Sequence, residues 1–108
     1  IRLKVYVRED MVGGGKLDLL KTVGETGSIS SAAKIMGLDY KRAWFLLDTL
    51  QRCFKDPLFK TNRGGGSSGG TSLTKLGSQL IEKFSNTDIE VKKVTLDFLK
   101  WLERNQRT

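Results

Sequence analysis

Apolar and polar side chains alternate over the first residues of the chain. This period of two, across residues 3–9, is typical of a β-strand with one buried face, and its apolar members are Leu3, Val5 and Val7. Three consecutive glycines at positions 13–15 then interrupt the chain. We therefore expect one N-terminal strand ahead of the glycines.

The following segment changes to a helical period. From Lys16, apolar residues recur at three-residue steps, which predicts a short helix that ends at the glycines within residues 24–27. A run of small and apolar residues then predicts a second helix. It begins at Ser28 or Ser30, both good N-cap residues, and it ends at Gly37.

A third helix is predicted directly after Asp39, another N-cap candidate. Its apolar residues recur at steps of four, three and four, so they share one face. They are Ala43, Leu47, Leu50 and Phe54. Two helices joined by a short turn that contains glycine are the signature of a helix-turn-helix, which we place at residues 28–55.

The next pattern predicts a β-hairpin. Two segments with strand character lie on either side of Arg63 and a loop, residues 64–70, of five glycines and two serines. The alternative is a flexible tether between two domains. It is less favoured because the residues after it would form a helix with no partner for its apolar face. We therefore interpret residues 58–74 as a wing within a single domain of residues 1–108.

The last segment, residues 75–105, contains neither turn nor strand signals and predicts a long helix capped by Thr74. Its later apolar residues recur at steps of three, four and three, which is a short heptad-like stripe. The stripe consists of Val91, Val94, Phe98 and Trp101, with Leu102 beside it. We interpret it as the interface of a homodimer. The alternative is that the helix folds back onto its own domain.

Composition limits the chemistry available to the chain. Its 108 residues include no histidine and a single cysteine, so it lacks the usual general base and the commonest metal ligand and can form no internal disulfide. We expect no metal site, no cofactor and no enzymatic activity. No apolar run approaches the roughly 20 residues that span a membrane. The N-terminus also lacks the apolar core of a signal peptide, so we expect a cytoplasmic protein with no membrane partner.

The formal net charge is +7, and most of it lies in the middle of the chain. Residues 28–75 hold eight basic and three acidic residues, whereas the two ends are nearly balanced. An excess of this kind indicates a polyanionic partner, and the alternative is a basic face that is merely solvated.

The third helix carries side chains that suit such a partner on the face opposite its apolar residues. Lys41 and Arg42 can donate to phosphate or to guanine, and Tyr40 can donate to backbone or base. Trp44 and Phe45 have two readings. Either they pack against neighbouring elements, or they are exposed and contact thymine methyl groups.

Three motifs occur in order at the expected spacing: Thr26-Gly-Ser-Ile-Ser-Ser-Ala-Ala-Lys, Tyr40-Lys-Arg-Ala-Trp, and the glycine-rich loop followed by Leu73-Thr-Lys-Leu-Gly. In these motifs the run from Gly24 to Leu80 resembles the N-terminal DNA-binding domain of the molybdate-dependent transcriptional regulators (ModE). That domain is itself similar to the winged helix-turn-helix of LysR-type regulators. The resemblance covers a little over half of the chain.

The resemblance implies a mostly α fold with a small β-hairpin: a winged helix-turn-helix with an N-terminal strand and a long C-terminal helix. It also implies a homodimer that binds operator DNA, which is double-stranded, through a recognition helix and a glycine-rich wing. The expected DNA-binding residues are Ser28, Ser30, Tyr40, Lys41, Arg42, Trp44, Lys60, Arg63, Gly64, Gly65, Thr74 and Lys75. Full-length members also carry C-terminal oxyanion-binding domains, so we do not expect molybdate to bind this chain alone.

Two other classes of function compete with this reading. A winged helix can serve as a protein-interaction module, in which the same basic and aromatic face binds a protein. An enzyme with a phosphate-binding loop is the second alternative, but the glycines before Lys16 lack the earlier glycine and the following Ser or Thr of a P-loop.

Overall fold

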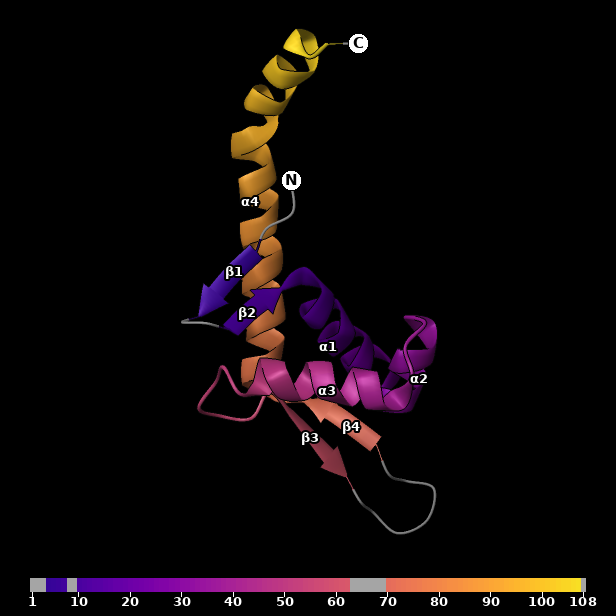
Figure 1. Cartoon of the computed structure of the whole chain (residues 1–108). Helices are drawn as coiled ribbons and strands as arrows, with labels where there is room; N and C mark the ends of the chain where they lie inside the picture. The colour runs from indigo at the N-terminus through magenta and orange to yellow at the C-terminus, as the bar shows by residue number, and fades with distance from the viewer. Residues whose placement is uncertain (1–3, 8–9, 63–69, 108) are drawn as a thin grey trace.

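The computed structural model describes residues 4–7, 10–62 and 70–107. Within them, four helices and two antiparallel strand pairs form a winged helix-turn-helix with a long C-terminal helix (Figure 1). The elements are, in order, β1 (Lys4–Val7), β2 (Asp10–Gly13), α1 (Gly14–Thr26), α2 (Ile29–Ile35), α3 (Tyr40–Gln51), β3 (Phe59–Asn62), β4 (Gly70–Leu73) and α4 (Lys75–Asn105). The predicted fold class is therefore confirmed.

The N-terminal strand belongs to a hairpin. β1 pairs with β2, from Lys4 opposite Gly13 to Val7 opposite Asp10. The predicted strand ahead of the glycines is therefore present, and a second strand that the sequence did not predict extends to the first glycine. β2 begins with Asp10 and ends with Gly13, two residue types that are depleted in strands. Its Val12 is buried in the core.

Helix α1 begins at Gly14, two residues before the start predicted at Lys16. The first N–H groups of any helix have no partner within the helix, so helix-breaking residues interrupt few hydrogen bonds there. The end of α1 agrees with the prediction. Gly27 is its C-cap with a φ of 73°, a left-handed conformation that favours glycine, and its N–H donates to the Val23 carbonyl at 2.8 Å.

Polar caps fix the two helices of the helix-turn-helix. The Ser28 hydroxyl accepts a hydrogen bond from the Ser31 N–H at 3.1 Å at the start of α2. Asp39 Oδ1 accepts one from the Arg42 N–H at 2.7 Å at the start of α3. Ser30 lies inside α2 and is not its cap, since only one of the two predicted serines has the extended backbone of an N-cap.

The predicted apolar face of α3 is largely correct. Ala43, Leu47 and Leu50 are completely buried. The fourth predicted member, Phe54, lies beyond the end of the helix and is only half-buried, because α3 ends at Gln51. The buried core as a whole consists of Val12, Leu17, Leu19, Leu20, Val23, Ile29, Ala32, Ala33, Ala43, Leu47, Leu50 and Leu58.

The second hairpin is fixed at its base to the helix-turn-helix. β3 and β4 pair from Phe59 opposite Leu73 to Asn62 opposite Gly70. The Thr71 N–H donates to the Gly27 carbonyl at 2.8 Å, which ties β4 to the turn between α1 and α2. The hairpin strands that the sequence predicts are therefore present, while residues 63–69 of its loop lie outside the described part of the chain.

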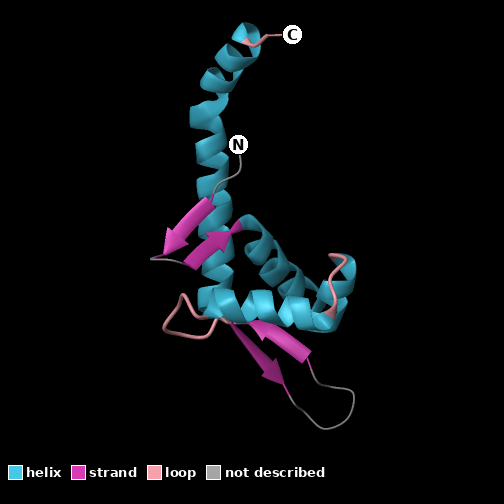
Figure 2. Cartoon of the chain, viewed as in Figure 1, coloured by secondary structure: helices cyan, strands magenta, loops and turns pink. Residues whose placement is uncertain are grey.

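The long helix α4 has two different halves. Its first turns supply half-buried residues that pack on the core, namely Leu76, Leu80, Ile81 and Phe84. Gly77 is buried against the Leu58 carbonyl, where any Cβ would collide with backbone. The second half extends away from the core, as Figure 2 shows, so the helix does not fold back over its own domain. Among the described helices, none combines the length and the apolarity that crossing a membrane requires.

Candidate functional site

The outward face of α3 combines aromatic and basic side chains. Three large aromatic side chains of its first turns remain exposed: Tyr40 at 53%, Trp44 at 43% and Phe45 at 55%. Lys41 and Arg42 are exposed between them. The buried residues of the same helix hold this face outward, because they are packed on the opposite side. These side chains therefore lie on the face of α3 that is opposite its buried residues.

The charges along α3 divide into paired and unpaired groups. Arg52, the C-cap residue of α3, forms an ion pair with Asp48 one turn earlier, with 2.8 Å between nitrogen and oxygen. In the described ranges, neither Lys41 nor Arg42 forms an ion pair with a carboxylate. The start of α3 is thus the positive end of the helix surface, and its cations are available to an anionic partner.

The two readings of the neighbouring aromatic residues separate in the structure. The ring of Trp44 meets Phe59 of the hairpin edge to face, with ring centroids 6.1 Å apart and planes at 82°. This contact is intramolecular and joins α3 to β3, as expected for T-shaped aromatic pairs. Phe45 has no such ring partner in the described structure. Its ring lies instead under the Arg42 guanidinium, whose carbon is 5.7 Å from the ring centroid.

The hairpin adds a second basic element beside α3. Lys60 is exposed on β3, the strand whose Phe59 contacts Trp44. Three predicted wing residues, Arg63, Gly64 and Gly65, lie outside the described residues. The structure therefore places the base of the hairpin next to α3 and leaves its loop undescribed.

Of the remaining predicted site residues, two have side chains that form hydrogen bonds within the described part of the domain and two do not. The Ser28 hydroxyl serves as the cap of α2. The Thr74 hydroxyl donates to the Pro57 carbonyl at 2.7 Å and accepts from the Gly77 N–H at 3.1 Å, so its hydrogen is already used. Ser30 and Lys75 are exposed and have no such structural role.

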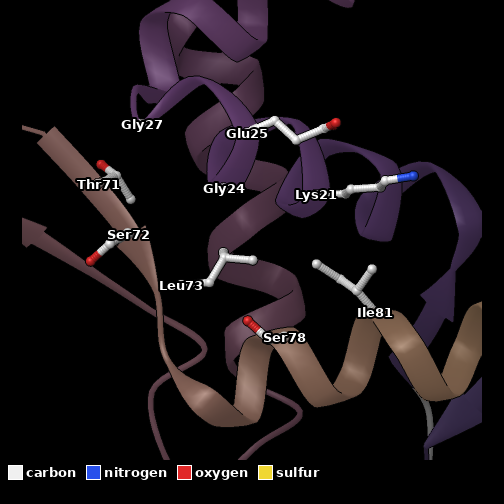
Figure 3. Close-up of a pocket in the computed structure, with 9 residues that line it drawn as sticks. All are labelled: Lys21, Gly24, Glu25, Gly27, Thr71, Ser72, Leu73, Ser78 and Ile81. Atoms are coloured by element: carbon white, nitrogen blue, oxygen red, sulfur yellow. The ribbon is translucent and has the colours of Figure 1, made fainter.

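A hollow of about 520 Å³ lies between α1, β4 and the first turns of α4 (Figure 3). Leu73 and Ile81 contribute its apolar lining, and Lys21 and Glu25 are exposed on α1 at its edge. Gly24 also lines it, and a Cβ at this position would lie 2.7 Å from the Leu73 side chain. No group of acidic and cysteine side chains suited to a metal ion occurs among the residues that the structure describes.

A separate apolar surface covers the distal half of α4. Val94, Phe98 and Trp101 are exposed at 80%, 58% and 52%, and the last two rings are stacked with centroids 6.4 Å apart. Val91 and Leu102 are half-exposed on the same helix. The residues of the predicted stripe therefore share a helical surface that nothing in the described chain covers.

Comparison with known proteins identifies relatives of the region that contains the helix-turn-helix and the second hairpin. A family model described as bacterial regulatory helix-turn-helix protein, lysR family, matches residues 15–78, from the start of α1 to the start of α4. The molybdenum-pterin-binding protein MopA of Rhodobacter capsulatus is 38% identical over 73 residues, which is 68% of this chain and 28% of that protein.

Two further relatives both carry the name ModE. The molybdenum transport protein ModE of Azotobacter vinelandii is 36% identical over 69% of this chain and 28% of its own length. The DNA-binding transcriptional dual regulator ModE of Escherichia coli (strain K12) is 35% identical over 64% of this chain and 26% of its own length. The chain thus spans only about a quarter of the length of these curated relatives, and the resemblance to ModE-type regulators is confirmed.

Proposed function

The chain belongs to the lysR family of bacterial regulatory helix-turn-helix proteins, and we propose that it regulates transcription by binding double-stranded DNA. This is a family of regulators and not of enzymes. The observation that carries the proposal is the surface at the start of α3, where Lys41 and Arg42 are exposed without a carboxylate partner among the described residues. Recognition helices insert their N-terminal residues into the major groove.

We assign the hairpin the role of a wing on the sugar-phosphate backbone. Lys60 is exposed on the strand that contacts α3 through Phe59 and Trp44, so a duplex that meets α3 also meets the hairpin. Glycines such as Gly64 and Gly65 allow close approach of the backbone, and Arg63 adds a charge beside them.

We further propose that the functional unit is a homodimer joined through the distal half of α4. Exposed apolar patches of this kind mark interaction sites in soluble proteins, and the heptad-like spacing of Phe98 and Trp101 suits a second helix. A dimer would present two α3 helices to half-sites about one DNA turn apart. Such bivalency raises operator affinity by roughly 10²–10⁴-fold over one domain.

Molybdate is not part of the proposed function of these residues. The resemblance to ModE-type regulators puts oxyanion binding in separate domains, and the exposed cations described above face outward from α3. Isothermal titration of this chain with molybdate should therefore give no saturable heat, whereas tight binding would show that an oxyanion site exists here.

The decisive experiment is selection of binding sites from random duplex DNA. We expect enrichment of a palindromic sequence and an affinity that falls linearly with salt concentration on logarithmic axes, as counterion release requires. The alternative function, a protein-interaction module, predicts no enriched sequence and only weak binding that unrelated duplex displaces equally well.

A further inference from the structure

Phe45 is the apolar side chain at the centre of the outward face of α3. The helical period of 100° per residue puts it roughly opposite the buried Ala43, Leu47 and Leu50. It remains 55% exposed, and it follows Lys41 by one turn of the helix. Unlike Trp44, which packs against the hairpin, it makes no ring contact with another element in the described structure.

The ring of Phe45 also holds the side chain of Arg42. A guanidinium over an aromatic face is attracted by the quadrupole of the ring, and here the guanidinium carbon is 5.7 Å from the centroid. An ion pair with a carboxylate would occupy N–H donors, but this contact uses none of the five. Arg42 is therefore restrained in position while its donors stay available.

We infer that Phe45 reads the C5-methyl group of a pyrimidine that neighbours a guanine bound by Arg42. In the major groove, guanine presents O6 and N7 to an arginine fork, and the methyl group of thymine is the apolar feature of the next base pair. Successive bases are about 3.4 Å apart along a strand, so two side chains in contact with each other meet adjacent base pairs. The inference deepens the proposed function and rests on it.

The same methyl group occurs in thymine and in 5-methylcytosine, and the chemistry of recognition is shared. Burial of one such group against the ring is worth about 0.8 kcal/mol, which corresponds to roughly a fourfold change in affinity. Because the Arg42 guanidinium lies over the Phe45 ring, we also expect a preference for guanine at the adjacent base pair.

The test uses the full chain and the duplex that it selects from random DNA. Each thymine of the half-site is replaced singly by uracil, which removes only the methyl group. We expect one position to lose about fourfold in affinity with the wild-type chain and to lose nothing with Phe45→Ala. Cytosine and 5-methylcytosine at that position give the second arm. Tighter binding with 5-methylcytosine than with cytosine would show that the methyl group itself is read. If only thymine binds more tightly than uracil, and methylation of cytosine has no effect, thymine is the source of the methyl group.

A second variant separates the two roles of the ring. Phe45→Leu keeps an apolar contact but has no ring quadrupole, so it should retain most of the uracil penalty. Replacement of the neighbouring guanine by 7-deazaguanine, which lacks the N7 acceptor, should weaken the wild-type chain several-fold and Phe45→Leu by less. Circular dichroism melting checks that both variants fold, as expected for an exposed side chain.

The outcomes distinguish this inference from the proposed function. If the wild-type chain binds its selected duplex and every uracil substitution changes affinity less than twofold, the methyl contact is refuted and the proposed function stands. An equal uracil penalty in wild type and Phe45→Ala also refutes it. Failure of the wild-type chain to bind any duplex overturns both.

Discussion

Helices α3 and α4 both expose aromatic side chains, and the surroundings of these side chains differ. On α3, Phe45 lies beside cations that have no carboxylate partner in the described structure. On α4, Phe98 and Trp101 stack on each other, and two lysines of the preceding turns form ion pairs within the helix, Lys92 with Asp88 and Lys93 with Glu90. This difference supports the two proposed partners, a polyanion for α3 and an apolar surface for α4.

The largest expected effect tests the α4 surface. Phe98→Asp combined with Trp101→Asp should convert the protein to a folded monomer, because both side chains are exposed and contribute little to the core. Operator affinity should fall by roughly 10²–10⁴-fold as bivalency is lost. Sedimentation of the protein and titration of a duplex with two half-sites measure the two effects.

A matched control for this variant is available on the same helix. Ile89 and Leu96 are exposed at 49% and 48% but lie on another face. Ile89→Asp combined with Leu96→Asp should leave both association and affinity unchanged. Dissociation by this control, or a wild-type chain that sediments as a monomer at tens of micromolar, would contradict the proposed interface.

A smaller effect is expected on α3. Lys41→Ala or Arg42→Ala should weaken DNA binding by about 1–3 kcal/mol. If the residue reads a base, the sequence preference at one base pair should also relax. If it contacts phosphate, the affinity should fall equally for all sequences. Arg52→Ala is the control, since this arginine is already paired with Asp48. A larger loss of DNA affinity for Arg52→Ala than for Lys41→Ala or Arg42→Ala would show that the binding surface does not lie at the start of the helix.

DNA binding through α3 and association through α4 should also differ in their dependence on salt concentration. The affinity for DNA should fall with a logarithmic slope of about −0.9 for each phosphate contact, and Lys60→Ala should flatten that slope by about one contact. Association through α4 should change little over the same range, because its core is apolar. The comparison fails if dimerisation weakens with salt as steeply as DNA binding does.

The smallest expected effect concerns the ion pairs of α4. Lys92→Gln and Lys93→Gln remove exposed pairs at spacings of four and three residues. Such pairs contribute about 0.3–0.5 kcal/mol, so thermal stability, association and operator affinity should all stay near the wild-type values. A marked loss of dimer in either variant would show that these lysines contact the partner directly.

Local chemistry accounts for the parts of the fold that the sequence predicts well. The caps of α2, α3 and α4 involve Ser28, Asp39 and Thr74, each with a side chain that accepts a backbone N–H. Since such signals lie within a few residues of the element that they define, they can be read without the tertiary structure. The predicted bounds of the long C-terminal helix are also confirmed.

The missed features depend on contacts between distant segments. β2 is a strand because it pairs with β1, and its four residues carry no strand pattern of their own. The closeness of Gly77 to the Leu58 carbonyl joins residues that are far apart in the sequence. The division of roles between Trp44 and Phe45 likewise required the position of Phe59 in the hairpin, so the sequence alone left both readings open.

The fastening of the second hairpin has a consequence for how a duplex is chosen. Its base is held at the Gly27 carbonyl by the Thr71 N–H and at α3 by the edge-to-face contact of Trp44 with Phe59. These two contacts fix the spacing between α3 and the strands. The duplex must then supply the adjustment, and sequences differ in how readily their grooves widen or bend. We expect operator preference to extend to base pairs that no side chain touches.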